Sequence, residues 1–263
     1  MKRALALICC FALSLALAGC GSDDENKLVV GATAKPHAEI LKVVQPILEK
    51  EGIDLEIKEF TDYVLLNPAL NDGEIDANFF QHIPYLEDSN EKNKTDLVWT
   101  VKVHNEPMGV YSKKFKKIED LPNDARVGIP NDTTNGGRAL MVLEKSGVIK
   151  LKEGAGVTAT DKDIAQNLKN LKIQMMDAAM LARSLDDLDA CVINSNYAIE
   201  ADLNPVEDSV FMEPKDSPFA NVLVVRAEDK DKEAVRKLGK ALQSAEVKEF
   251  LEENYEGSCV PAF

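Results

Sequence analysis

The chain alternates short apolar runs with stretches in which apolar residues recur at helical spacing. Residues 28–31 and 55–60 have the pattern of strands, and residues 36–48 between them place their apolar positions on one helical face. Pro46 interrupts that face and predicts a kink or a break in the helix. This alternation predicts an α/β fold built on mainly parallel sheets.

Two features of the pattern recur and suggest two similar lobes. Residues 126–130 repeat the first strand, and the polar residues 131–137 form a loop before a helix that starts at Ala139. Residues 74–80 and 187–193 each run from an acidic turn through an alanine into an apolar strand. Chance alone could produce the first of these echoes, so the second carries the inference.

The C-terminal part adds a strand at residues 219–226 and a charged helix at residues 231–255. If this part returns to the first lobe, the chain crosses between lobes twice, near residues 107–112 and 204–217. The predicted division is lobe 1 at residues 28–109 plus 211–263, and lobe 2 at residues 110–210. Clefts between such units are where α/β proteins bind small molecules.

The N-terminus has the features of an export signal. After a basic start, residues 4–18 are almost entirely apolar, a run shorter than the roughly 20 residues of a membrane span. The run ends in Leu-Ala-Gly-Cys at Cys20, which resembles the bacterial lipobox. We therefore expect a signal peptide at residues 1–19 and a lipidated cysteine with a flexible tether at residues 20–27, outside the cytoplasmic membrane. An ordinary signal peptide with a chance cysteine is the alternative.

Composition narrows the function further. The 263 residues include 31 Lys+Arg and 45 Asp+Glu, a formal net charge of −14 that argues against nucleic-acid binding and against charge-driven binding to anionic lipid. The 3 histidines lack metal-site spacing, and G-x-S-x-G and H-E-x-x-H motifs are absent, so we expect neither a cofactor, a metal nor catalysis. Cys191 and Cys259 could pair, although two separate buried or loop thiols fit the pattern as well.

Aromatic residues follow the strand of the first lobe. Phe79 and Phe80 point to opposite faces of a strand, so one ring can join the core while the other faces the cleft. His82 and Tyr85 come just beyond the strand end. The alternative is that both rings lie in the core and His82 lies in a solvated loop.

Candidate polar residues for ligand binding come from the second lobe and from the last long strand, residues 219–226. The loop at residues 131–137, made flexible by Gly136 and Gly137, would expose backbone N–H groups to an anion, and Arg138 adds a planar fork suited to a carboxylate. Asn194 and Asn221 place amides at the end of one apolar strand and inside another, where each needs a backbone or ligand partner.

Taken together, these segments resemble the NlpA/MetQ family of methionine-binding lipoproteins, the substrate-binding proteins of ABC importers. The resemblance rests on residues 31–33, 36–41, 62–65, 76–86, 106–109, 131–138, 185–194 and 217–226. It implies a two-lobed, periplasmic-binding-protein-like fold of type II with the ligand between the lobes. It also implies a monomer that binds L- or D-methionine, meets the importer's permease and ATPase subunits, and touches the membrane only through its lipid.

The resemblance assigns roles to the candidates. Arg138 would clamp the methionine carboxylate, and Asn194 and Asn221 would hold the other backbone polar groups. The methionine side chain would be enclosed by Tyr63, Phe80 and Tyr85, with His82 at the pocket edge. Arg138→Ala would then abolish tight binding and leave the fold intact. The alternatives are a binder of another amino acid or of a Met-containing dipeptide, an extracytoplasmic enzyme acting on a small carboxylate, and a lipoprotein without a ligand.

Overall fold

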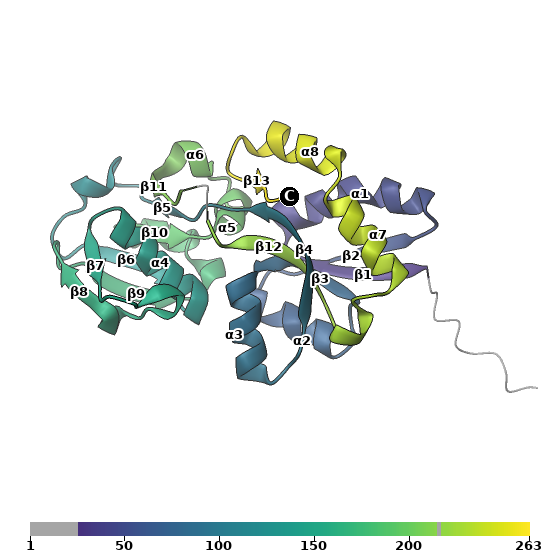
Figure 1. The fold of residues 1–263 in the computed structure, drawn as a ribbon. Helices are drawn as coiled ribbons and strands as arrows, with labels where there is room; N and C mark the ends of the chain where they lie inside the picture. The colour runs from purple at the N-terminus through teal and green to yellow at the C-terminus, as the bar shows by residue number, and fades with distance from the viewer. Residues whose placement is uncertain (1–25, 215–216) are drawn as a thin grey trace, which may run out of the picture.

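The computed structural model describes residues 26–214 and 217–263, and these form two lobes, each built on its own sheet (Figure 1). The first lobe contains a 6-stranded sheet with the order β13-β4-β12-β3-β1-β2. Its strands are β1 (Lys27–Ala32), β2 (Asp54–Glu59), β3 (Ala77–His82), β4 (Val98–Asn105), β12 (Ala220–Val225) and β13 (Val260–Pro261). Strand β1 is parallel to β2 and β3, whereas β12 is antiparallel to β3 and β4.

The second lobe contains a 5-stranded sheet with the order β11-β5-β10-β6-β9 and a separate pair, β7-β8. The strands are β5 (Gly109–Tyr111), β6 (Arg126–Pro130), β7 (Ile149–Leu151), β8 (Ile164–Asn167), β9 (Lys172–Met176), β10 (Ala190–Ile193) and β11 (Ser209–Met212). Strand β10 is parallel to β6 and antiparallel to β5, just as β3 is parallel to β1 and antiparallel to β12. The echo between residues 74–80 and 187–193 therefore marks equivalent strands of the two lobes.

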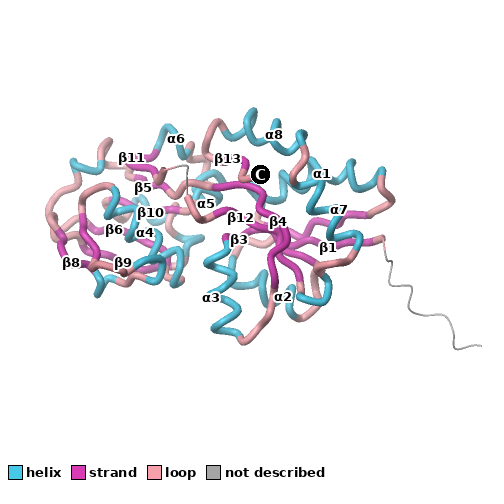
Figure 2. Tube along the Cα trace, viewed as in Figure 1, coloured by secondary structure: helices cyan, strands magenta, loops and turns pink. Residues whose placement is uncertain are grey.

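Helices cover both faces of the first sheet, with α1, α7 and α8 on one face and α2 and α3 on the other (Figures 1 and 2). The helices of the chain are α1 (Glu39–Lys50), α2 (Leu66–Asn71), α3 (Ile83–Asn93), α4 (Thr133–Lys145), α5 (Ser195–Glu200), α6 (Pro205–Asp208), α7 (Glu233–Leu242) and α8 (Ala245–Tyr255). None of the helices in the described part of the chain is long and apolar enough to cross a membrane.

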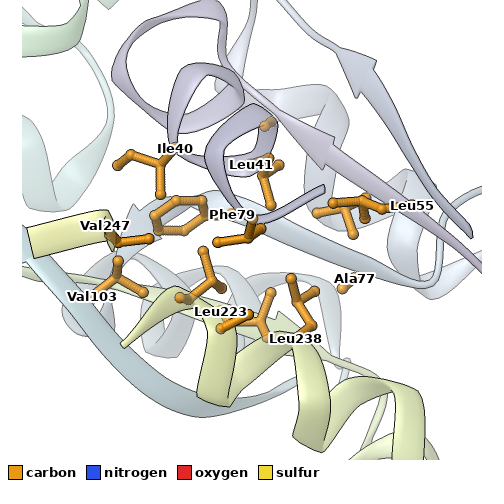
Figure 3. Close-up of a cluster of buried hydrophobic side chains, with 14 of the residues drawn as sticks. Ile40, Leu41, Leu55, Ala77, Phe79, Val103, Leu223, Leu238 and Val247 are labelled. Carbon is orange, nitrogen blue, oxygen red and sulfur yellow. The ribbon is translucent and has the colours of Figure 1, made fainter. Parts of the chain in front are cut away.

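The core of the first lobe explains the neighbouring phenylalanines. Phe79 is fully buried among residues of α1, β4, β12, α7 and α8, as Figure 3 shows. Phe80 lies on the opposite face of β3 and joins a second cluster, which contains aromatic side chains from both lobes. Of the two alternatives that the sequence left open, the structure therefore supports the one in which Phe79 joins the core and Phe80 lies at the cleft, not the one in which both rings lie in the core.

Three sequence expectations about the elements need correction. The sheets are mixed rather than mainly parallel, because strands next to the crossings between lobes run antiparallel to their neighbours. The helix expected at residues 231–255 is two helices, since Ser244 caps α8 through a hydrogen bond from the N–H of Val247. Of the kink or break expected at Pro46, the break is absent: helix α1 runs from Glu39 to Lys50, and the exposed position of Pro46 leaves the carbonyl group that lost its donor accessible to water.

The two cysteines in the described part of the chain lie apart in the fold. Cys191 is in β10 of the second lobe, Cys259 precedes β13 of the first lobe, and both are buried and free. Each fills a small apolar space, which is the usual behaviour of a buried free cysteine. The expected signal peptide, Cys20 and most of the tether lie outside the described residues.

Candidate functional site

The chain passes between the lobes at two places, and a cavity lies against the first of them. The first crossing, residues 106–108, joins β4 to β5, and the second crossing joins β11 to β12 and begins at Glu213. The two crossings are bonded to each other, because Glu213 N–H donates to the Met108 carbonyl at 2.9 Å and Met108 N–H donates to Glu213 Oε2 at 3.2 Å. The cavity holds about 330 Å³ of empty space, part of it open to solvent.

Residues of both lobes line this cavity. They are Tyr63, Phe80, Gln81, His82, Tyr85, Glu106, Asn135, Arg138, Asn194, Ser195, Asn196 and Asn221. Every site residue predicted from the sequence is among them. Their roles toward a ligand remain predictions, which the arrangement of polar atoms makes more specific.

Arg138 is held in place by both crossings. Its Nη2 donates to Glu213 Oε2 at 2.6 Å and to the Glu106 carbonyl at 2.7 Å, and its Nε donates to Glu213 Oε2 at 3.2 Å. The guanidinium carbon lies 4.3 Å from the centre of the Phe219 ring, a cation–π contact. Within the described residues Nη1 has no hydrogen-bond partner, so this nitrogen presents two N–H groups of a buried cation to the cavity.

The segment before Arg138 is helical, which corrects the expectation of a flexible loop. Helix α4 starts at Thr133 because the Asp132 side chain caps it, accepting from the N–H of Asn135 at 2.9 Å. A carboxylate therefore already occupies the helix N-terminus that we expected to bind an anion. Gly137 serves close packing rather than flexibility, since a Cβ atom there would lie 2.1 Å from the Val157 carbonyl oxygen.

Glu106 supplies the opposite charge at the first crossing. Its Oε1 accepts hydrogen bonds from His104 Nε2 at 2.7 Å and from Asn221 Nδ2 at 3.2 Å, and His37 Nε2 lies 3.2 Å from the same oxygen. Burial acts to raise the pKa of Glu106, but the histidines and the charge of Arg138 outweigh it and the pKa is lowered. No donor among the described residues bonds Oε2, so a carboxylate oxygen also faces the cavity unpaired.

His37, His104 and Glu106 are also the one group with metal-site spacing that the described part of the chain contains. Their ligand atoms lie within 4.8 Å of one another, although the histidines are far apart in sequence. In a tetrahedral zinc site, ligand atoms about 2.0–2.2 Å from the metal lie roughly 3.3 Å apart. His104 Nε2 and Glu106 Oε1 lie 2.7 Å apart, which is a direct hydrogen bond, so we assign no metal to this group.

Aromatic rings form the other end of the cavity. The Tyr63 ring centre lies 5.6 Å from that of Phe80 and 6.0 Å from that of Tyr85, and Phe80 and Tyr85 are 5.7 Å apart. The Tyr63 hydroxyl donates to Asn196 Oδ1 across the lobes. Burial raises the pKa of Tyr63 well above its usual value, so the phenol stays neutral. The cavity thus has a charged end at the crossings and an aromatic end on the first lobe.

His82 and Asn194 meet at the seam between the lobes. Both donate to Asn135 Oδ1, His82 through Nε2 at 3.2 Å and Asn194 through Nδ2 at 2.8 Å. His82 is the last residue of β3 and caps α3, rather than lying in a solvated loop. Burial, helped by the charge of Arg138, lowers its pKa to about 3, so the ring is neutral. Asn194 Oδ1 is buried without a partner and is a further acceptor at the cavity.

Sequence reasoning gave no role to Glu106, Asn135 or Glu213. Glu106 stood in a motif of the family resemblance and next to a predicted crossing, and Asn135 stood in a segment already suspected of binding an anion. Those positions were the available signal. Glu213 lay within the second predicted crossing, but nothing there indicated its partner Arg138, which is 75 residues away.

Comparisons with known proteins agree on one family. The family described as NlpA lipoprotein matches residues 28–263. The D-methionine-binding lipoprotein MetQ of Salmonella typhimurium is 45% identical over 252 residues, covering 94% of this chain and 93% of that protein. The methionine-binding lipoprotein MetQ of Bacillus subtilis is 41% identical over 256 residues, covering 93% of each chain. A nutrient binding protein from Burkholderia cenocepacia, solved bound to methionine, is 49% identical with a TM-score of 0.87, covering 90% of this chain and 100% of that one.

Proposed function

Because the chain belongs to the NlpA lipoprotein family, we propose that it captures methionine between its lobes and delivers it to an ABC importer. Two similar proteins are named for methionine, and a third, a nutrient binding protein, was solved with methionine bound. The observation that carries the proposal is a pair of oppositely charged side chains at one end of the cavity, each with one polar atom that no described residue bonds (Arg138 Nη1 and Glu106 Oε2), with aromatic rings at the other end.

The charged end suits the backbone of a free amino acid. An α-amino acid carries a carboxylate and an ammonium group on one carbon, so its two binding groups must lie close together. Arg138 Nη2 donates to the Glu106 backbone carbonyl, which places the guanidinium and the first crossing side by side. Arg138 Nη1 would donate to the ligand carboxylate and Glu106 Oε2 would accept from the ammonium. A charge-assisted hydrogen bond of this kind is worth about 1.5–3 kcal/mol.

The remaining contacts follow from the same orientation. Asn194 Oδ1 is an unpaired acceptor for the ammonium group, and Asn221 lines the same end of the cavity. The side chain of the ligand would extend toward Tyr63, Phe80 and Tyr85. Thioether sulfur next to aromatic rings gains about 0.3–1.5 kcal/mol per contact, which favours methionine over a branched aliphatic side chain.

Closure of the lobes would transmit binding to the importer. Direct contacts already join the lobes at the cavity, among them His82 with Asn135 at 3.2 Å and Tyr197 Oη with the Thr61 carbonyl at 3.2 Å. A ligand that touches both lobes stabilises this arrangement over an open one. The permease and ATPase subunits would respond to the closed form, while a lipid on Cys20 would keep the monomer at the membrane.

Isothermal titration calorimetry on refolded, ligand-free protein tests the proposal. L-methionine, D-methionine, leucine, glutamine and a methionine dipeptide form the panel, and we expect one or both methionine enantiomers to bind most tightly. Another amino acid binding tenfold more tightly than either would refute methionine as the ligand. Conversion of any panel member into product would show an enzyme instead. Native mass spectrometry of freshly purified protein provides an independent check, since a carried-over ligand should have the mass of methionine.

A further inference from the structure

We propose that His104 and His37 are positioning residues for Glu106: His104 bonds Oε1 directly, and His37 bonds Asn221, which donates to the same oxygen, so that Oε2 receives the ligand and only a ligand with a free α-ammonium group binds tightly. This inference rests on the proposed function, because it concerns the same cavity. It deepens that function by assigning specificity to two histidines that do not line the cavity.

The two histidines reach Glu106 from different parts of the first lobe. His37 belongs to the short helix η1 (Ala34–Ala38) before α1, and His104 is near the end of β4. The exposed fractions of His37, His104 and Glu106 are 1%, 0% and 6%. At this depth water cannot replace His104 as a donor to Glu106 or His37 as a donor to Asn221, so the carboxylate orientation depends on the rings themselves.

The hydrogen-bond partners define which ring nitrogens carry protons. His37 Nε2 faces two acceptors, Glu106 Oε1 at 3.2 Å and Asn221 Oδ1 at 3.3 Å, so it must carry the hydrogen. His37 Nδ1 then accepts from the Thr33 hydroxyl at 2.7 Å. Burial lowers the pKa of His37 to about 4, which agrees with a neutral ring in this tautomer. His104 also donates through Nε2.

This arrangement uses up one carboxylate oxygen and leaves the other. Oε1 accepts hydrogen bonds from His104 and Asn221, which occupy its two lone pairs, and His37 Nε2 lies 3.2 Å from it. Oε2 receives none from the described residues. A group with several N–H donors and a positive charge, such as an ammonium, fits that oxygen better than a neutral group does.

Packing keeps the imidazoles from turning away. The His37 ring contacts Phe79 edge-on at 4.7 Å between centres, His104 lies 5.5 Å from Phe79, and the two imidazoles are 5.1 Å apart. His104 Nδ1 is buried without a partner. A leucine would fill that space without leaving a polar atom unpaired, so packing alone does not account for a histidine there.

The chemical consequence is that the cavity selects ligands that carry an α-ammonium group. Without an ammonium, the ligand leaves the Glu106 charge buried and unpaired on the cavity side, which disfavours closure. Methionine analogues that lack the charge should therefore be rejected, even though their thioether and carboxylate are unchanged. The desamino analogue 4-(methylthio)butanoate and N-acetylmethionine are two such compounds.

Calorimetry with methionine and 4-(methylthio)butanoate tests the inference in four proteins. Wild type should prefer methionine by about 10³-fold or more, because sites built to pair a polar group reject ligands that lack it. His104→Leu should reduce this preference at least tenfold, roughly the loss of one buried hydrogen bond to a charged group. His104→Gln, which keeps a side-chain donor, should restore most of the preference. His82→Gln is the matched control, because His82 is a buried histidine at the cavity without a bond to Glu106, and it should weaken both ligands alike.

Each outcome decides one question. If wild type binds methionine but His104→Leu keeps the full preference, the positioning role is wrong while the proposed function stands. If wild type does not bind methionine, the proposed function fails. Should His104→Leu not fold, ¹⁵N NMR of the histidines in methionine-bound wild type decides instead. Protonated Nε2 and unprotonated Nδ1 in both rings between pH 6 and 8 support the inference, and any other tautomer overturns it.

Discussion

Arg138 should contribute to folding as well as to binding, and the two contributions can be separated. Its side chain and that of Glu213 are 4% and 3% exposed, with Nη2 and Oε2 2.6 Å apart. Removing only the arginine leaves a buried carboxylate without its partner, which costs about 3–5 kcal/mol. A typical domain is stable by only about 5–15 kcal/mol. The expectation from sequence is that Arg138→Ala leaves the fold intact; the buried pair adds the prediction that the variant also loses a large part of its stability.

A double-mutant cycle of Arg138→Met and Glu213→Gln measures both effects. Arg138→Met alone should lower the free energy of unfolding by about 3 kcal/mol or more. Adding Glu213→Gln should recover most of that loss, because no unpaired charge then remains buried. Methionine affinity should stay reduced roughly 10- to 150-fold in both, which corresponds to one lost charge-assisted hydrogen bond.

Urea unfolding gives the stabilities, and calorimetry on the folded proteins gives the affinities. The proteins must be stripped of ligand by unfolding and refolding, since bound methionine would add its own stabilisation. If the double variant regains methionine affinity together with stability, the guanidinium acts only in folding and its role toward the carboxylate is wrong. If Arg138→Met is as stable as wild type, the reasoning about the buried pair is wrong.

Three further predictions test other parts of the structure. Phe79→Ala should lower the free energy of unfolding in urea by about 3–5 kcal/mol and leave the preference for methionine over leucine unchanged. Phe80→Ala should reduce that preference. Equal effects of the two variants would contradict the assignment of Phe79 to the core and Phe80 to the cavity. Gly137→Ala should destabilise the protein by about 1–3 kcal/mol or more, because its Cβ would lie 2.1 Å from a backbone carbonyl oxygen. Gly239→Ala is the control: its Cβ would lie 3.2 Å from a valine methyl group, so its stability in thermal unfolding should stay close to that of wild type. Burial lowers the pKa of His82 to about 3 in the folded state, so the unfolded state binds the proton more readily below about pH 6.5. The free energy of unfolding should therefore fall as the pH drops from about 6.5, by up to about 1.4 kcal/mol per pH unit. His82→Gln should flatten this pH dependence, as measured by urea unfolding at pH 4.5 to 7.

The elements that could be predicted from sequence are those with local causes. Apolar runs predicted the ends of strands β1, β6, β10 and β12 to within one or two residues, because a buried strand needs consecutive apolar side chains wherever it lies. Alternation along β3 separated Phe79 from Phe80, since side-chain direction in a strand follows from position alone. Aromatic and polar residues at strand ends then indicated the cavity, which such folds form at the carboxyl ends of their strands.

The sequence contains a signal for the start of α4, the capping residue Asp132, but the prediction of a loop overlooked it. Asp132 precedes residues that can continue a helix, and aspartate is a common cap. Two adjacent glycines suggested a loop instead, because glycine usually lowers helix propensity. Here the glycines leave room for neighbouring backbone atoms. A Cβ atom on Gly136 would lie 2.8 Å from the Pro130 carbonyl oxygen, and one on Gly137 would lie 2.1 Å from the Val157 carbonyl oxygen. Close approach between segments is a tertiary property, and no local pattern contains it.

The polar network could not be predicted, because its partners are distant along the chain. His37 bonds Asn221 over 184 residues, Asn221 bonds Glu106 over 115, and Arg138 bonds Glu213 over 75. A lone arginine or glutamate in the sequence is best explained as a solvated surface residue. Burial changes that assignment, since buried charges occur with partners, and the partners are known only once the two crossings are in place.

The position of these charges at the crossings has a consequence for closure. Glu106 and Glu213 lie where the chain passes between lobes, and Arg138 is bonded to both segments. A rotation of the lobes moves residues near the crossings least and residues far from them most. Under the proposed function, the zwitterionic end of methionine would therefore find its partners nearly in place before closure. The contacts of Tyr63 with Asn196 and of His82 with Asn135 would form only as the lobes meet around the side chain. Affinity for any free amino acid would then come mainly from the crossings, and selection of methionine from closure.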